Sequence, residues 1–393
     1  MHNSLLPKPT TKAIALSQRL IATIKQTINE AGGAIPFSDF MNQALYAPGL
    51  GYYSAGVCKL GGDFITAPEI SPLFSRCVAR QCQAVLSTLT DGVILEFGAG
   101  SGIMAAEILK ELERLNCLPS QYLILEVSAD LRQQQRVTLQ TQVPTLFKRI
   151  QWLDSLPKIP LNGIILANEV LDAMPVSIFR LDEQQVSEFY VGLATANNNE
   201  SETPFAWQVL PTRAQSLRVA IEKLRPTLPV GYVSEMNLVL PAFLQSVADV
   251  LATGMVLLID YGFPNGEYFH PQRESGTLMC HYRHHAHTIP LILVGLQDIT
   301  AHVNFTLVAE AAHAAGLHVA GYTTQAKFLL ASGLPEFLTA LDPSDTKNYL
   351  QWTQQAKTLT NPSEMGELFK VMALTVNLDI PLPGFVRDER FRL

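Results

Sequence analysis

A glycine-rich turn carries the clearest chemical signal in the sequence. The apolar run Val93-Ile94-Leu95-Glu96-Phe97 leads directly into Gly98-Ala99-Gly100-Ser101-Gly102, and an amphipathic helix pattern follows. Glycine lets the backbone adopt positive φ and pass close to a ligand. A dinucleotide-binding turn has the spacing GxGxxG, whereas the residue three after Gly100 is Ile103. We therefore expect Gly98, Ala99, Gly100 and Gly102 to contact a nucleoside-like ligand other than NAD; an ordinary tight turn is the alternative.

Carboxylates stand close to this turn. Glu96 lies in the strand before it, and Glu126 ends the next predicted strand, where a carboxylate can accept bonds from both hydroxyls of a ribose. Two such acids would repel a pyrophosphate but suit S-adenosylmethionine (SAM), because its sulfonium is cationic and its ribose hydroxyls are free. Asp154 follows a third apolar stretch, where it either accepts a bond from the adenine amino group or is solvated. The pattern favours SAM as the cofactor.

Two more acids follow the predicted strand at 164–167. The segment reads Asn168-Glu169-Val170-Leu171-Asp172-Ala173-Met174-Pro175 and contains no aromatic side chain that could stack on a nucleic-acid base. Glu169 and Asp172 suit a guanidinium, which paired carboxylates can orient through charged hydrogen bonds. We expect Asn168 to lie beside the cofactor. The alternative is that Asn168 and Asp172 only cap the next helix.

The elements that position these residues alternate. Apolar runs at 93–97, 122–127 and 164–167 alternate with helix patterns, one of which begins at Gly102; a helix at 240–251 and a strand at 255–261 resume the pattern. Such alternation is typical of a parallel sheet with crossover helices. We expect an α/β fold with a sheet domain at 91–393, preceded by a helical N-terminal cap at 1–90. The stretch 176–235, with a hairpin at 177–192 and a polar loop at 194–203, is predicted as an insertion, and 263–304 as an irregular segment on the substrate side.

Composition narrows the class of protein. Of the 393 residues 48% are hydrophobic and only 16% are charged, which excludes a disordered tail protein and a coiled coil. The net charge of −7 argues against a basic nucleic-acid groove, and no apolar run reaches the roughly 18 residues of a membrane span. The five scattered cysteines form no CxxC pair, so a reducing compartment is the simplest inference. The amphipathic helix pattern at 16–28 favours a structural helix and hence a cytoplasmic location. The alternative is a mitochondrial presequence, because residues 1–31 contain four basic side chains and one acidic one.

Polar residues in the last third of the chain are weaker candidates. Tyr261, Asp298 and His302 are candidate proton acceptors or supporting groups, with a purely structural role as the alternative for each. Four histidines lie at 281–287 beside Cys280, but their spacing matches no standard metal-ligand pattern, and methyl transfer to nitrogen requires no metal. We therefore expect no metal site there, and we interpret the segment as part of a substrate or partner surface.

Several motifs together resemble the MidA family of class I SAM-dependent methyltransferases. They are the glycine turn, the segment at 168–175 and the following runs: Ala44-Leu45-Tyr46-Ala47-Pro48-Gly49, Gly51-Tyr52-Tyr53-Ser54, Gly62-Asp63-Phe64-Ile65-Thr66-Ala67-Pro68-Glu69-Ile70, Asp260-Tyr261-Gly262, Gly276-Thr277, Asp298-Ile299-Thr300-Ala301-His302-Val303 and Met365-Gly366-Glu367-Leu368-Phe369-Lys370-Val371. They span nearly the whole chain.

The resemblance implies a class I Rossmann-like fold, SAM as the methyl donor and a protein arginine as a candidate acceptor. Mitochondrial members of the family are complex I assembly factors, which implies a respiratory-complex subunit as a candidate partner. The resemblance also implies that the loop with Asp63 and Thr66 folds over the cofactor; a purely structural loop is the alternative. A second hypothesis, from another functional class, also remains: the protein is an assembly module that binds SAM and holds a client without methylating it. Ile103 disfavours a third hypothesis, an NAD-dependent dehydrogenase.

Overall fold

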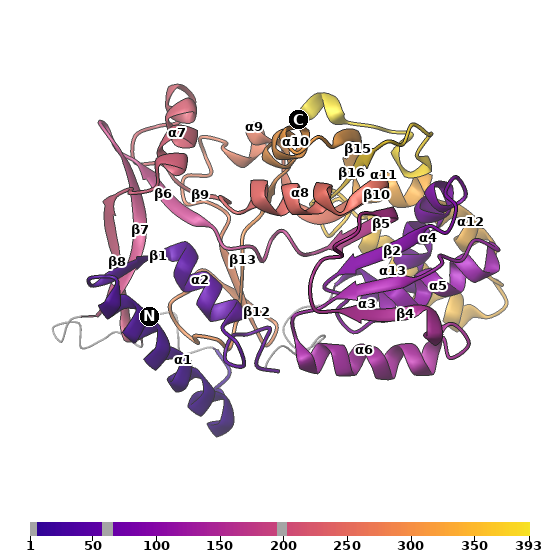
Figure 1. Ribbon diagram of the computed structural model, residues 1–393, viewed down its shortest axis with the longest axis horizontal. Coiled ribbons are helices and arrows are strands. Elements are labelled where there is room, and N and C mark those ends of the chain that lie inside the picture. Colours follow the sequence, from indigo (N-terminus) through magenta and orange to yellow (C-terminus); the bar gives the residue numbers. More distant parts are fainter. Residues whose placement is uncertain (1–5, 57–65, 195–202) are drawn as a thin grey trace. The chain divides into compact units, whose positions relative to one another are not determined.

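The computed structural model describes residues 6–56, 66–194 and 203–393 (Figure 1). The chain folds into two compact units. Unit 1 combines residues 1–64, 172–240 and 266–302, and unit 2 combines residues 65–171, 241–265 and 303–393. Within the described ranges, no helix is both long enough and apolar enough to cross a membrane.

Unit 2 is built on one eight-stranded sheet. Its strands follow the order β15-β16-β10-β5-β2-β3-β4, and β14 pairs with the end of β10. The pairs from β10 through β5, β2 and β3 to β4 are all parallel, and β16 pairs antiparallel with both β10 and β15. The bounds are β2 Val93–Phe97, β3 Tyr122–Leu125, β4 Ile150–Leu153, β5 Leu161–Asn168, β10 Leu251–Phe263, β14 Val303–Asn304, β15 His318–Thr324 and β16 Phe369–Val376.

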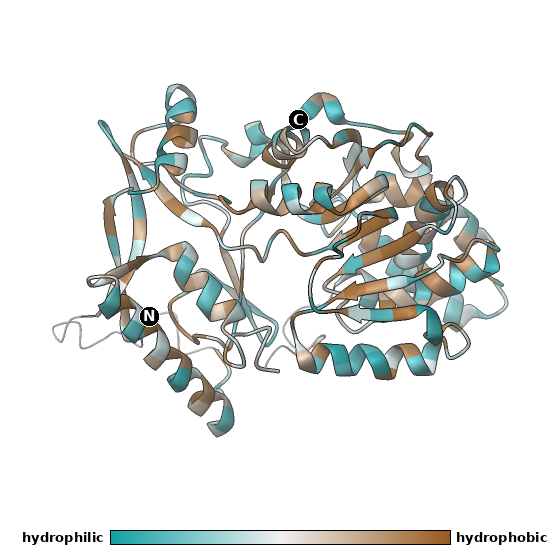
Figure 2. Ribbon diagram, viewed as in Figure 1, coloured by the Kyte–Doolittle hydropathy of each residue, from teal (hydrophilic) through white to brown (hydrophobic). Residues whose placement is uncertain are grey.

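Helices cover this sheet because its central strands are apolar on both faces. Figure 2 shows β2 and β5 largely brown, as expected of strands buried on both sides, whereas α6 is largely teal. Alternate side chains such as Ile164 and Leu166 share one core with α4, α5 and α11. The helices are α3 Ala67–Ile70, α4 Pro72–Leu86, α5 Ile103–Arg114, α6 Ala129–Gln142, α8 Leu240–Asp249, α10 Phe305–Ala314, α11 Gln325–Ala331, α12 Leu334–Thr339 and α13 Thr346–Thr360, with 3-10 turns at Phe147–Arg149, Pro383–Phe385 and Arg390–Arg392.

Local sequence signals explain where several of these helices begin. The Ser71 hydroxyl accepts from the N–H of Leu73, and Pro72 occupies the first helical position of α4. Ser128 caps α6 by accepting from the N–H of Leu131. The Asn304 side chain caps α10 in the same way. These caps satisfy N–H groups that have no partner inside the helix.

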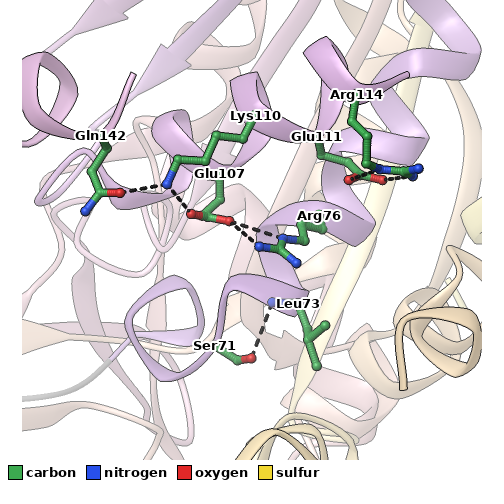
Figure 3. A network of polar contacts seen from close by, with 8 residues as sticks. All are labelled: Ser71, Leu73, Arg76, Glu107, Lys110, Glu111, Arg114 and Gln142. Carbon is green, nitrogen blue, oxygen red and sulfur yellow. Dashed lines mark hydrogen bonds and ion pairs between the residues drawn. The ribbon is translucent and has the colours of Figure 1, made fainter. Parts of the chain in front are cut away.

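An ion-pair network joins α4 to α5 (Figure 3). Glu107 is nearly buried, and its carboxylate accepts from both Arg76 (3.1 Å) and Lys110 (2.8 Å). Glu111, equally buried, accepts from Arg114 at 2.7 Å. Buried carboxylates are stable only when paired in this way, so the network fixes the register of the two helices beside the glycine turn.

Unit 1 is a mixed α/β unit. In its sheet, β7 pairs with β8 along one edge and with β1 and β6 along the other, and β9 pairs with β6. A three-stranded sheet has the order β12-β11-β13. The bounds are α1 Thr11–Glu30, β1 Ala34–Pro36, α2 Phe37–Tyr46, β6 Ser177–Leu181, β7 Val186–Leu193, β8 Phe205–Pro211, α7 Gln215–Leu224, a 3-10 turn at Arg225–Thr227, β9 Val233–Met236, β11 Met279–Tyr282, β12 His285–His287 and β13 Asp298–Thr300; α9 spans Asn265–Tyr268.

The chain divides differently from the predicted arrangement. The N-terminal cap is not purely helical, because β1 pairs with β7. Its residues up to 64 join the segments 172–240 and 266–302 in one unit, whereas α3 and α4 belong to the sheet unit. The reason is long-range strand pairing, which periodicity within one stretch cannot reveal. The predicted hairpin at 177–192 is confirmed as β6 and β7; the polar loop at 194–203 lies mostly outside the described residues.

Candidate functional site

The glycine turn follows β2 and leads into α5. Gly98, Gly100 and Gly102 all have positive φ (59°, 54° and 86°). A side chain at Gly102 would also meet the backbone of α6, because an added Cβ would lie 3.2 Å from the Cα of Gln135. The three glycines are therefore required by the backbone path and by the close packing of α5 on α6. Ala99, the fourth residue predicted at this turn, is buried.

Glu126 stands immediately after β3, and its carboxylate is held in place. One oxygen accepts from the N–H of Ser128 (2.9 Å), and the other accepts from Nε2 of Gln135 (3.0 Å). Burial raises the pKa of Glu126, and these hydrogen bonds lower it. Each carboxylate oxygen has a second lone pair with which it can accept from a ligand hydroxyl.

Gln135 is a residue that the sequence analysis missed. Its Nε2 also donates to the carbonyl of Gly100 (3.0 Å), and its Oε1 accepts from Nε1 of Trp152 (2.8 Å). One amide thus connects the glycine turn, Glu126 and β4. Its position in the middle of a polar helix gives no sequence signal, because the contacts come from three separate elements.

Asp154 follows β4 and pairs with Arg132. Nη1 of Arg132 donates to Oδ1 of Asp154 (2.6 Å), while Nε donates to the carbonyl of Glu126 (2.7 Å). The Asp154 side chain is 92% exposed. Arg132 therefore ties the ends of β3 and β4 together, and the predicted role of Asp154 toward adenine stays a prediction.

Glu96 differs from Glu126 in its surroundings. Its side chain is buried, and Oε2 accepts from the hydroxyl of Tyr122 on the neighbouring strand at 2.8 Å. Burial raises the pKa of Glu96 to about 7; the Tyr122 bond lowers it, and the charge of Glu126 raises it. The two acids expected beside the glycine turn are thus held by different partners. The predicted contact of Glu96 with the cofactor stays a prediction.

We expect Glu96→Gln to change how stability depends on pH. The folded protein keeps a proton on Glu96 up to about pH 7, whereas the unfolded chain releases it near its ordinary pKa of 4.5. The free energy of unfolding of the wild type therefore falls as the pH rises through this window. The amide has no proton to lose, so the wild type should lose roughly 2–3 kcal/mol more than Glu96→Gln between about pH 5 and pH 8. Urea unfolding at a series of pH values measures this; parallel curves for the two proteins would contradict it.

Residues before the sheet also reach the glycine turn. The carboxylate of Glu69, on α3, accepts a hydrogen bond from the Ser101 hydroxyl. Thr66 directly precedes α3. Asp63, predicted with Thr66 to lie over the cofactor, falls outside the described residues.

The chain leaves β5 through a constrained turn. Asn168 ends β5, and its Oδ1 is buried with no hydrogen-bond partner among the residues that the structure describes. Glu169 has a positive φ of 53°, which is uncommon for a residue other than glycine. Its N–H donates to the carbonyl of Ile259 on β10 (2.9 Å). The two residues that follow are held by Asp260, which the sequence analysis named only as part of a motif. Tyr261 comes next on β10, and its ring packs edge to face on Phe369.

The other predicted residues belong to unit 1. Asp172 and Asp298 are both buried. Oδ1 of Asp298 accepts from the hydroxyl of Tyr53 (3.0 Å), whose ring stacks on Tyr46. The N–H of His302 donates to Oγ1 of Thr277 (3.0 Å). Sequence reasoning missed Tyr53 as the partner of Asp298, although the tyrosine-rich run at 46–53 marks the region.

The histidine-rich segment forms a hairpin. His281 on β11 stands opposite Ala286 on β12. Arg283 and His284 form the turn, and both have positive φ. Across residues 6–56, 66–194 and 203–393, no three His, Cys, Asp or Glu side chains come together as a metal site would require.

Comparison with known proteins defines the class. The chain is a SAM-dependent methyltransferase: its residues 77–323, more than half of the sequence, match the model of a family of S-adenosyl-L-methionine-dependent methyltransferases. It belongs to that family, Methyltransf_28. The predicted enzyme class and the predicted cofactor are both confirmed.

Relatives support the same assignment over nearly the full length. A crystal structure of a Burkholderia thailandensis protein bound to S-adenosyl-homocysteine (SAH) is 41% identical, covers 99% of this chain and all of its own, and superposes with a TM-score of 0.93. The protein arginine methyltransferase NDUFAF7 of Danio rerio is 28% identical over 91% of this chain and 85% of its own length. The human protein of that name is 27% identical over 95% of this chain and 86% of its own length. The family resemblance noted in the sequence is thereby confirmed.

Proposed function

We propose that unit 2 is a class I Rossmann-like unit that binds SAM along the glycine turn and Glu126. The residues present fit this cofactor. The three glycines with positive φ have no side chain that could block a ligand at their positions, and the fixed, buried carboxylate of Glu126 is suited to ribose hydroxyls. The buried Oδ1 of Asn168 lacks a partner among the described residues, as expected of a group that accepts from a ligand. Glu96, Asp154, Thr66 and Asp63 are further proposed contacts.

The acceptor in this proposal is a guanidinium nitrogen of an arginine in a protein. The observation that carries it is Glu169, a carboxylate held in a strained backbone at the carboxyl end of β5. Ligands of open α/β sheets bind at this edge, and strained residues cluster at functional sites. A carboxylate there suits a cationic acceptor. The relatives named protein arginine methyltransferases support the same acceptor.

Bound SAM supplies a methyl group activated by its sulfonium, so the protein mainly has to position the acceptor. Glu169 accepts N–H bonds from the guanidinium and orients it. Charge pairing on one side of the guanidinium concentrates positive charge there and leaves another nitrogen better able to attack. As the bond from that nitrogen to the methyl carbon forms, the methyl–sulfur bond would break and leave SAH, and the nitrogen would give up one proton. Asp172, Tyr261, Asp298 and His302 are proposed as supporting or proton-accepting groups.

A second candidate is an assembly module that binds SAM and holds a client protein. The observation that favours it is unit 1, a compact unit separate from the sheet unit and built from three stretches of chain. A respiratory-complex subunit as client and a cytoplasmic location, with the mitochondrial matrix as the alternative, remain proposals. In cells, Glu169→Gln separates the two functions: client maturation that survives loss of methyl transfer favours the assembly module.

Transfer of labelled methyl groups tests the proposed function. A cell extract depleted of its own SAM is incubated with the enzyme and SAM carrying a labelled methyl group, and is then separated into protein, nucleic-acid and small-molecule fractions. We expect label in protein, and no transfer by a Gly100→Val variant. Label confined to nucleic acid or to small molecules would refute a protein acceptor.

A further inference from the structure

Asp260 lies where β10 passes the end of β5. The two parallel strands are in register up to Asn168 and Ile259, so Asp260 is the next residue on β10. Its side chain is fully buried, and Oδ2 accepts from the N–H of Val170 (3.2 Å) and of Leu171 (3.0 Å). Oδ1 accepts from the N–H of Tyr261 (2.9 Å). One carboxylate therefore binds the two residues that follow Glu169.

These bonds continue the strand pairing into the turn. The N–H of Glu169 pairs with the carbonyl of Ile259, in the manner of a further rung between β5 and β10. The next two N–H groups point to the Asp260 carboxylate instead of a carbonyl. Three consecutive N–H groups are thus fixed while Glu169 keeps its positive φ. A left-handed backbone costs roughly 1–2 kcal/mol for an ordinary residue and persists only where its surroundings impose it.

The charge of Asp260 has a buried neighbour of opposite sign. Lys370 on β16 stands directly opposite Asp260 in the antiparallel register and is also buried. Its ammonium donates to the carbonyls of Glu367 and Leu368. A buried carboxylate is costly unless it is compensated, and here the three N–H donors of Val170, Leu171 and Tyr261 reduce that cost.

We propose that Asp260 is a positioning residue for methyl transfer: it holds the backbone that aims Glu169 at the acceptor and does not itself contact cofactor or acceptor. This inference rests on the proposed role of Glu169. The glycine turn has its own supports, since Gly98 bonds to Leu125 and Gly100 to Gln135. Loss of the Asp260 carboxylate therefore affects acceptor turnover and leaves cofactor binding intact.

The test combines hydrogen exchange with kinetics in the full-length protein. Asp260→Asn keeps the size of the side chain but replaces one of its two oxygens with an NH2 group. That group cannot accept from the N–H donors that the oxygen binds in the wild type. We expect amide exchange at Val170 and Leu171 to rise about tenfold to a hundredfold, with kcat falling by a similar factor and the Kd of SAH staying within about threefold. The amide of Leu257, inside β10, should exchange as in the wild type.

Two further variants make the test selective. Glu188→Gln alters another buried carboxylate, on β7 of unit 1, and should change neither Val170 exchange nor kcat. If Asp260→Asn does not fold, Asp260→Glu keeps the charge opposite Lys370 and displaces the carboxylate by one methylene, with the same selective exchange expected. In a Glu169→Gly background, where positive φ costs little, the loss in urea midpoint caused by Asp260→Asn should be at least halved.

The outcomes separate this inference from the proposed function. Unchanged exchange at Val170 and Leu171, or an equal loss of SAH affinity and kcat, would overturn the positioning role. A wild type that methylates no protein would overturn the proposed function, and the exchange and midpoint measurements would still decide whether Asp260 fixes the Glu169 turn.

Discussion

Gly100→Val is expected to remove measurable SAM binding while the protein stays folded. Gly100 has a φ of 54°, a backbone conformation that a β-branched residue adopts at a cost of roughly 1–2 kcal/mol. The valine side chain would also occupy space beside the turn, where the cofactor has to lie close to the protein backbone. Calorimetric titration with SAM and with SAH measures the loss.

Gly316→Val is the matched control for this experiment. Gly316 lies between α10 and β15 with a φ of 83°, and an added Cβ there meets no atom within 4 Å. This variant therefore introduces comparable backbone strain far along the chain from the glycine turn. We expect it to lose similar stability and to bind SAM as the wild type does. A folded Gly100→Val protein with wild-type affinity would contradict the assignment of the turn.

Glu169→Gln is expected to impair methyl transfer far more than SAM binding. The substitution keeps the shape of the side chain and removes the charge that would pair with a guanidinium. A charged hydrogen bond contributes roughly 1.5–3 kcal/mol, so kcat/KM should fall about tenfold to a hundredfold if the bond forms in the transition state. The Kd of SAM should stay within about threefold, because in the proposed function the lost charge would contact the acceptor and not the donor.

Glu113→Gln, on the exposed side of α5, controls for the loss of one negative charge from unit 2. Steady-state kinetics with a methylatable protein fraction should give wild-type values for it. Equal losses of SAM affinity and of turnover in Glu169→Gln would instead assign Glu169 to the cofactor. Wild-type turnover in Glu169→Gln would show that the charge of Glu169 plays no part in the reaction.

Much of the structure around the glycine turn could be predicted from the sequence because its signals are local. The strand at 93–97, the glycine turn and the helix after it occupy one short stretch, and the structure has β2 and α5 at these positions. The serine and proline that open α4 are a similarly local signal. Glu126 comes directly after β3, close to its predicted place, although the strand stops at Leu125 and not at 127.

The remaining features depend on contacts between distant residues. Gln135 connects three elements, and Asp260 binds N–H groups that lie 89 and 90 positions earlier in the chain. Nothing in the sequence near either residue marks these roles. Glu96 and Glu126 are both glutamates near the ends of the adjacent strands β2 and β3. Only Glu96 accepts from a tyrosine hydroxyl, which belongs to Tyr122 on the adjacent strand. The composition of unit 1 likewise follows from β1 pairing with β7, which no local pattern could reveal.

Identification of the methylated residue tests the central claim most directly. Protein from the labelled extract is hydrolysed, and the modified amino acid is identified by mass spectrometry, with Gly100→Val as the unlabelled control. A lysine acceptor would have to lose its proton before attack and would gain little from a carboxylate that orients a guanidinium. We predict methylated arginine; methyl-lysine, a methylated base or an O-methyl product would contradict the account.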